Sequence, residues 1–156
     1  GLMIAPDGTP KVLEYNCRFG DPETQPILMR LRSDLLELCL AALEGRLDQI
    51  SAEWDPRAAL GVVMAAGGYP GGYAKGHVIE GLEAAGRIPD AKIFHAGTTF
   101  SDGRFRTDGG RVLCATALGS SVSAAQARAY ALVERIHWEG AYFRRDIGHR
   151  AVAREG

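Results

Sequence analysis

The chain lacks an excess of charge of either sign. Its 156 residues include 18 lysines and arginines and 19 aspartates and glutamates, so the formal net charge is −1. Proteins that bind nucleic acids or anionic membranes electrostatically usually carry a clustered basic excess. The charge balance therefore favours neither function, and a hydrophobic fraction of 46% is typical of a globular protein.

Long apolar runs and cysteine pairs are also missing. No stretch approaches the roughly 18–20 apolar residues of a membrane span, and the start "GLMIAPDG" lacks the basic and apolar regions of a signal peptide. Cys17, Cys39 and Cys114 are odd in number, widely spaced and without a CxxC pair, which argues against a disulfide framework or a zinc site. We therefore expect a reducing, cytoplasmic setting. Cys17 could be a nucleophile, but no histidine is near it in sequence.

The first part of the chain, residues 1–48, reads as a β-hairpin followed by helices. Apolar Leu2–Ala5 and the strand "KVLEYN" flank the turn "PDGTP". A shorter apolar turn around Ile27–Leu31 then precedes a helix with Ser33 as N-cap and Gly45 as its stop. The polar segment 49–57, which contains a proline, suits a linker.

Residues 58–156 read as a separate compact unit. "ALGVVMAA" is a continuous apolar strand, "HVIEG" and "KIFHAGTTF" are short strands, and "RFRTDGGRVLCATALG" is expected to form a hairpin turning at Asp108–Gly110. Ser123 and Gln126 form a capping-box pattern that opens a helix with apolar positions at Tyr130, Val133, Ile136 and Trp138. The segment "YFRRDIGHRAVARE" follows as a short helix or tail. We therefore expect an α+β fold.

Polar side chains are unusually frequent in the stretch "KVLEYNCRFGDPETQP", residues 11–26. A strand at this place would be expected to contribute mainly apolar side chains to the core. Alternate side chains of a strand share a face, which would put Glu14 and Asn16 on one side, about 7 Å apart. Mg²⁺ often takes one or two protein oxygens and completes its shell with phosphate oxygens and water. The pair is therefore a candidate nucleotide-metal clamp, although an exposed strand face also carries Glu and Asn routinely.

Three further charged residues follow this pair. Arg18 lies two residues after Asn16, one alternation further along the strand, and its guanidinium could bind phosphate or carboxylate with two hydrogen bonds. The turn "FGDPE" is expected to bring Asp21 and Glu23 back toward the strand end, although Asp before Pro is also a good turn former. This density of charge is more than a turn needs and indicates half of an active site.

These motifs together resemble a known enzyme family. "EYNCRFGDPETQPILMRLRSDLLEL" is similar to the end of the ATP-grasp domain of the phosphoribosylamine–glycine ligases, also called glycinamide ribonucleotide synthetases. "GVVMAAGGYPGGYAKG", "IFHAGT" and "TDGGRVLCATALG" resemble that family's C-terminal domain, in the same order. "NCRFGDPE" is specific, because other ATP-grasp ligases keep the acidic-x-Asn clamp but follow it with different residues. The likeness covers essentially the whole chain.

The resemblance implies a fold and a reaction. Residues 1–48 would be the C-terminal segment of an ATP-grasp domain, 49–57 a linker, and 58–156 a small mixed β-sheet domain with a packed helix. The family joins glycine to 5-phosphoribosylamine through glycyl phosphate in purine biosynthesis, giving glycinamide ribonucleotide, ADP and phosphate. Small-molecule substrates are therefore the implied partners, with neither nucleic acid nor membrane involved.

The resemblance also implies residue roles. Glu14 and Asn16 would hold the Mg²⁺ or Mn²⁺ that bridges the ATP phosphates. Arg18 would grip the anionic substrate or the acyl phosphate, as a catalytic and substrate-binding residue. Asp21 and Glu23 would contact the substrate or shape the loop. The C-terminal unit is expected to close one side of the active site.

Members of the family also have lysines and a glycine-rich loop that cover the nucleotide phosphates, and an N-terminal domain that contributes to the substrate site. None of these precedes Gly1. We therefore expect a truncated C-terminal part that is inactive alone.

Several alternatives stay open at this point. The reaction could belong to another ATP-grasp ligase, or the chain could be a non-catalytic β-rich binding or carrier module. Lys75 in "GYAKG" could be a modified lysine, but it lacks the methionine neighbours of a biotinylation site. The loop Gly68–Tyr73 could be a substrate lid or a plain hairpin connection. His95 is expected to be a satisfied core histidine.

Overall fold

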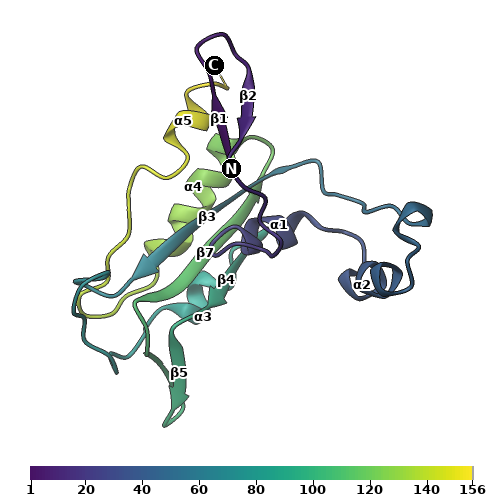
Figure 1. Ribbon diagram of the computed structural model, residues 1–156. Coiled ribbons are helices and arrows are strands. Elements are labelled where there is room, and N and C mark those ends of the chain that lie inside the picture. The colour runs from purple at the N-terminus through teal and green to yellow at the C-terminus, as the bar shows by residue number, and fades with distance from the viewer. Residues whose placement is uncertain (156) are drawn as a thin grey trace.

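The structure, a computed structural model, describes residues 1–155 and consists of a three-stranded sheet with helices on both faces and two projecting segments (Figure 1). A 3₁₀ turn covers Leu47–Gln49. The regular elements, in chain order, are β1 (Leu2–Ile4), β2 (Pro10–Val12), α1 (Thr24–Arg30), α2 (Leu35–Leu43), β3 (Ala58–Ala65), α3 (Leu82–Ala85), β4 (Ala91–His95), β5 (Thr98–Ser101), β6 (Arg104–Thr107), β7 (Arg111–Gly119), α4 (Val122–Val133) and α5 (His149–Val152).

The central sheet has the strand order β3-β7-β4. Both of its strand pairs are antiparallel, and so are the separate pairs β1-β2 and β5-β6. β7 lies in the middle because its run "VLCATALG" is buried on both faces, and only its first residue is exposed. The α+β class is thus confirmed, while the sheet within residues 1–155 is antiparallel rather than mixed as expected.

The hydrophobic core lies between the sheet and α4. On β3, Leu60, Val62 and Met64 alternate with less buried residues, so they share one face of the strand. α4 covers this face with Leu132 and Val133, and its buried alanines Ala125 and Ala129 let the helix approach closely. Of the four apolar positions predicted on this helix, Val133 is buried on α4 and Tyr130 is partly buried, whereas Ile136 and Trp138 are buried in the core beyond the end of the helix.

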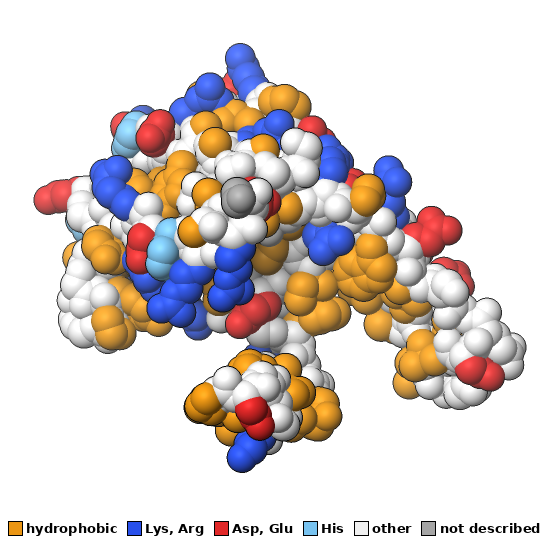
Figure 2. Space-filling view, turned by 90° about the horizontal axis from the view of Figure 1, so that it is seen from above, with side chains coloured by type: hydrophobic (Ala, Val, Ile, Leu, Met, Phe, Trp, Pro, Cys, Tyr) orange, Lys and Arg blue, Asp and Glu red, His pale blue; other side chains and the backbone are white. Residues whose placement is uncertain are grey.

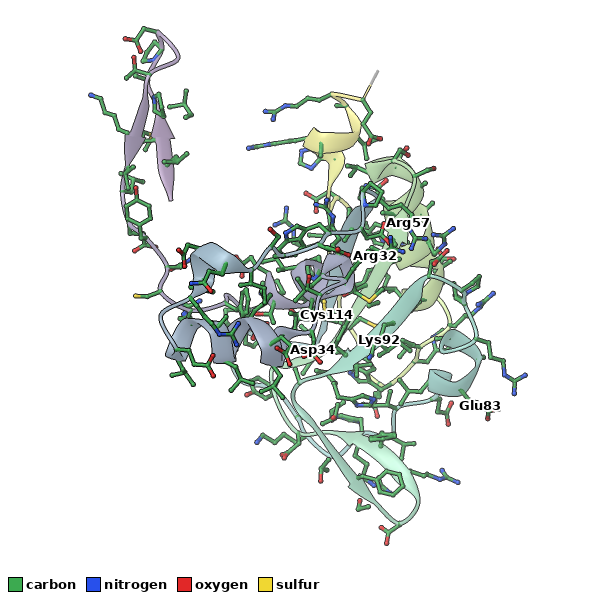
Figure 3. The ribbon with its side chains drawn as sticks, turned by 90° about the vertical axis from the view of Figure 1, so that its right-hand side faces the viewer. Arg32, Asp34, Arg57, Glu83, Lys92 and Cys114 are labelled. Atoms are coloured by element: carbon green, nitrogen blue, oxygen red, sulfur yellow. The ribbon has the colours of Figure 1, made fainter. Side chains whose placement is uncertain are left out.

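The opposite face of the sheet carries α1. A Cβ atom added to Gly61 on β3 would lie 3.1 Å from Cys114 Sγ and 3.8 Å from Pro26 Cδ. Pro26 belongs to α1, so this helix sits directly over small residues of β3 and β7. Cys114 lies within this layer in Figure 3. The early part of the chain is therefore packed onto the C-terminal unit.

The predicted hairpin turning at Asp108–Gly110 is wrong. β6 pairs with β5, whereas β7 pairs with β3 and β4. The chain crosses itself where Gly97 and Gly109 meet: a Cβ on Gly97 would lie 2.5 Å from Gly109 Cα. Two glycines allow this close backbone approach, and β6 pairs with β5 instead of with β7. The expected strand "HVIEG" is likewise reduced to isolated bridges at Val78 and Glu80.

Both predicted helix N-caps are displaced by one or two residues. The cap of α2 is Asp34, whose carboxylate accepts a hydrogen bond from the Leu36 amide (2.7 Å), while Ser33 accepts one from Glu53 instead. The cap of α4 is Ser121, and the predicted cap Ser123 lies inside the helix.

The amide of Gln126, the other half of the expected capping box, donates to the Ile147 carbonyl. The predicted end of α2 is confirmed, whereas α4 ends at Val133, earlier than the predicted helix, which included Ile136 and Trp138. Gly45 follows the end of α2 with a φ of 68°, a left-handed conformation that suits glycine. The last segment contains the short helix α5.

The polar segment 49–57 is held in place through its second half. The Arg32 amide donates to the Glu53 carbonyl, and the Asp55 amide donates to the Arg30 carbonyl (2.7 Å). The Asp55 carboxylate is buried and accepts two hydrogen bonds from Arg57 at 3.0 and 2.9 Å. Arg57 also pairs with Asp90 before β4 (2.9 Å), and it is labelled at one end of the sheet in Figure 3.

Replacing Asp55 by asparagine should make unfolding less sensitive to acid. The Arg57 guanidinium holds the pKa of the Asp55 carboxyl well below its usual value of 3.8, so this carboxylate stabilises the folded state at neutral pH. That stabilisation is lost as the pH falls below about 4. We expect the difference in urea midpoint between wild type and Asp55→Asn to be large at pH 6 and smaller at pH 3. A constant difference would contradict this role, and exposed Asp48→Asn is the control.

Two segments project from the body with apolar side chains exposed. The β1-β2 hairpin stands apart from the sheet, and α2 lies on an arm of its own (Figures 1 and 3). Figure 2 shows both as separate lobes with hydrophobic atoms on their surfaces. Examples are Leu2 at 61% exposed and Leu43 at 85%. Across residues 1–155, no helix combines the length and apolar character needed to cross a membrane.

Candidate functional site

Glu14 and Asn16 lie in an extended segment that follows β2. The strand ends at Val12, earlier than the sequence predicted, and only two backbone contacts continue the pairing. Leu13 donates to the Gly1 carbonyl (2.8 Å), and the terminal amine of Gly1 donates to the Glu14 carbonyl (2.9 Å). The Glu14 and Asn16 side chains are exposed, with no hydrogen-bond partner among residues 1–155, so their oxygens are free to bind a ligand.

Arg18 and Glu23 both lie close to Gly20. Gly20 is buried, and both the Glu23 carboxylate and the Arg18 guanidinium lie within 3.4 Å of the place where its Cβ would be. Arg18 Nη1 also donates to the Phe19 carbonyl (3.2 Å). The loop closes on itself through Thr24, whose amide and hydroxyl both donate to the Gly20 carbonyl at 2.9 and 2.6 Å. The turn thus brings Glu23 back toward Arg18.

Asp21 is held by the C-terminal unit. Arg111, the first residue of β7, places Nη2 3.2 Å from Asp21 Oδ2 and donates from Nη1 to the Asp21 carbonyl at 3.1 Å. Sequence reasoning did not single out Arg111, although it belongs to the motif "TDGGR". The separation of 90 residues leaves no local signal for the contact.

A cavity of about 320 Å³ opens beside this contact. Gly61, Val63 and Ala65 of β3 form part of its lining, and Pro22 and Arg111 form another part. The remaining lining residues are mainly aromatic or apolar: Tyr69, Tyr142, Phe143, Arg144 and Ile147. Tyr69 comes from the loop Gly68–Tyr73, so that loop borders the same cavity as the "FGDPE" turn.

The residues available for a metal ion are few. Within residues 1–155, no group of three or more histidine, cysteine, aspartate or glutamate side chains is arranged to hold one. Glu14 and Asn16 supply a carboxylate and an amide oxygen, the donors that a hard divalent cation prefers. Two such ligands fit a cation whose remaining positions are taken by nucleotide phosphates and water, and they do not fit a site closed by protein alone.

Other candidate groups are accounted for by their surroundings. His95 is exposed rather than buried, which corrects the expectation of a core histidine: its ring packs 4.4 Å from that of Phe105, and Nδ1 lies 3.0 Å from Thr98 Oγ1. Partial burial lowers the pKa of His95. Burial raises the pKa of the Cys114 thiol, which keeps it protonated and unreactive. Lys75 forms an ion pair with Asp108 (3.3 Å).

Comparison with known proteins identifies both parts of the chain. Residues 59–150 match the family model "Phosphoribosylglycinamide synthetase, C domain", and residues 1–24 match "Phosphoribosylglycinamide synthetase, ATP-grasp (A) domain". Proteins named phosphoribosylamine–glycine ligase are similar over 99% of the chain: 64% identical in Vibrio vulnificus, 66% in Allochromatium vinosum and 63% in Pseudomonas aeruginosa.

A solved structure agrees with these sequence matches. The crystal structure of phosphoribosylamine–glycine ligase from Thermotoga maritima aligns with a TM-score of 0.71 and 39% identity, covering 94% of this chain and 35% of that one. The chain spans 36% of the length of the three relatives named above. The family model of the C domain alone covers more than half of the 156 residues. The chain therefore belongs to the phosphoribosylglycinamide synthetase family.

Proposed function

We propose that the chain is part of an ATP-dependent ligase that joins glycine to 5-phosphoribosylamine, giving glycinamide ribonucleotide, ADP and phosphate in purine biosynthesis. The observation that carries this proposal is the presence of both family matches in one chain, the ATP-grasp domain at residues 1–24 and the C domain at 59–150. The proposed division is an ATP-grasp segment at 1–48, a linker at 49–57 and a C-terminal domain at 58–156. The enzyme would act in the cytoplasm.

Glu14 and Asn16 are the proposed ligands of Mg²⁺ or Mn²⁺. The cation would neutralise charge on the ATP phosphates while the γ-phosphoryl group is transferred to the glycine carboxylate. Both side chains are exposed at the end of the hairpin segment, which leaves room for a nucleotide beside them. Their carboxylate and amide oxygens support this assignment.

Arg18 is the proposed catalytic and substrate-binding residue. Its guanidinium can donate two hydrogen bonds to a phosphate or an acyl phosphate, which stabilises charge that develops during phosphoryl transfer. Glu23 lies near it, over Gly20, and could orient the guanidinium or accept a hydrogen bond from the substrate amine. Asp21 is proposed to contact substrate or to shape the loop, and its contact with Arg111 supports the second role.

The remaining groups needed for catalysis are proposed to come from the part of the ligase that the relatives carry in addition to this segment. The chain accounts for 36% of the Vibrio vulnificus relative. We therefore propose that these residues alone do not turn over substrate, and that the C-terminal unit closes one side of the completed site.

The test is an assay of the full-length ligase that carries this chain. We expect ADP to form only when glycine and 5-phosphoribosylamine are both present, and mass spectrometry to identify glycinamide ribonucleotide as the product. Omission of either substrate is the control. ADP formation that depends on a different acid or amine would assign the chain to another ATP-grasp ligase. A preparation of the 156 residues alone should produce no ADP above background.

A further inference from the structure

The loop that carries the proposed substrate-binding residues has little support from its own backbone. Residues 13–23 contain no helix or strand, and Arg18, Asp21 and Glu23 are all exposed. Within residues 1–155, every hydrogen bond and ion pair that joins this loop to the C-terminal unit comes from a single side chain, that of Arg111. Apart from the packing of α1, which follows the loop, the polar contacts that place the loop relative to the sheet therefore come from Arg111.

Arg111 is well suited to hold a loop in place. It begins β7, the central strand, whose next eight residues are all buried. Its own carbonyl accepts a hydrogen bond from the Gly97 amide (2.9 Å), which fixes the backbone at the strand end. A guanidinium on such a rigid base loses less conformational freedom when it binds than one on a mobile loop.

The contact also has two points of attachment. One nitrogen of Arg111 pairs with the Asp21 carboxylate (3.2 Å), and another donates to the Asp21 backbone carbonyl (3.1 Å). An ion pair alone would hold only the end of a side chain, whereas a bond to the carbonyl fixes the main chain between Gly20 and Pro22. Pro22 and Arg111 line the same cavity, so the turn borders that cavity beside the start of β7.

We propose that Arg111 is a positioning residue for the proposed ligation: it holds the main chain at Asp21, so that Arg18 and Glu23 keep the arrangement that substrate binding requires. This inference rests on the proposed function. A misplacement of about 1 Å in a substrate-positioning group can lower turnover by as much as about 100-fold. The C-terminal unit would then contribute to catalysis through one specific contact and not only by covering the site.

The first test measures the loop directly and does not depend on the reaction. Hydrogen–deuterium exchange of peptides covering residues 13–24 is compared in the full-length protein between wild type, Arg111→Ala and Arg87→Ala. Arg87 pairs with Glu83 on α3, so its loss removes a surface ion pair elsewhere in the fold. We expect about tenfold faster exchange in Arg111→Ala and no change in Arg87→Ala. Equal exchange in all three proteins would overturn the proposal.

The second test measures steady-state kinetics with ATP, glycine and 5-phosphoribosylamine. We expect Arg111→Ala to lower kcat by about tenfold with the KM for ATP unchanged, Arg111→Lys to lie between it and wild type, and Arg87→Ala to match wild type. Thermal unfolding should change little, because the Arg111–Asp21 pair is exposed. A variant that lost activity only in proportion to lost folded protein would assign Arg111 a purely structural role and overturn the proposal.

A double-mutant cycle separates positioning from direct substrate binding. If Arg111 acts through Asp21, the two substitutions remove the same interaction. The double variant Asp21→Asn/Arg111→Ala should then be as active as the less active of the two single variants. If Arg111 instead binds a substrate anion itself, the two effects should multiply and the KM for phosphoribosylamine should rise, which would overturn the proposal. A wild-type enzyme without glycine-dependent turnover would refute the proposed function, whereas unchanged kinetics in Arg111→Ala would refute only this inference.

Discussion

Replacing Glu14 by alanine in the full-length ligase is expected to lower glycine-dependent ADP formation by about 100-fold or more. Loss of groups that merely support a metal ligand typically costs 10–100-fold in metal affinity, and Glu14 is a proposed ligand itself. The side chain has no hydrogen-bond partner within residues 1–155, so its replacement should not destabilise the fold. The loss should therefore come from the metal site.

A Mg²⁺ titration distinguishes this cause from others. Activity of Glu14→Ala and Asn16→Ala should recover in part at high metal concentration, because a site with one ligand fewer still binds the cation weakly. Glu83→Ala, which removes a carboxylate that is 85% exposed on α3, should behave as wild type throughout. Wild-type turnover in both test variants would leave the family unchanged but would move the metal site to other residues.

Replacing Met64 by alanine is expected to lower the free energy of unfolding by about 2–5 kcal/mol, the usual cost of removing a large buried side chain and leaving a cavity. Met64 is fully buried on β3, opposite Leu113 of β7 and beneath α4. The sheet cannot move inward to fill the space, because β7 is held by hydrogen bonds to β3 on one side and β4 on the other.

Met3 offers a matched control in the same chain. It lies on β1 and is 58% exposed, so Met3→Ala removes the same atoms from a largely solvated position. Urea unfolding of the 156-residue chain, followed by circular dichroism, should show a large decrease in midpoint for Met64→Ala and a small one for Met3→Ala. Similar decreases for the two variants would contradict the assignment of the core to the interface between the sheet and α4.

Elements that have a strong local pattern could be predicted from the sequence. β3 and α4 were expected from a continuous apolar run and from helical spacing, and both occur, although α4 starts earlier than predicted and ends at Val133, before Ile136 and Trp138. The N-caps were predicted wrongly, because Ser33 and Asp34 are both good caps and the sequence does not say which one the backbone selects. In the structure Ser33 binds the Glu53 amide, which leaves Asp34 for the helix.

The partner of β6 could not be predicted from local pattern. A glycine-containing turn between two strand-like segments favours a hairpin, and "TDGG" lies between β6 and β7. The structure instead pairs β6 with β5, because β7 is already flanked by β3 and β4. Competition between strands for the two sides of β7 is a property of the whole sheet, and no window of sequence contains it.

The candidate site divides in the same way. By itself, the sequence determined the family and the residues proposed for metal and substrate, because the motif "NCRFGDPE" is continuous and its chemistry can be read from neighbouring residues. Only the tertiary structure decided what holds that motif in place. Arg111 reaches Asp21 across 90 residues of sequence, and this contact exists because α1 packs on the sheet whose central strand Arg111 begins. Such a contact depends on packing between distant segments, which local sequence does not encode.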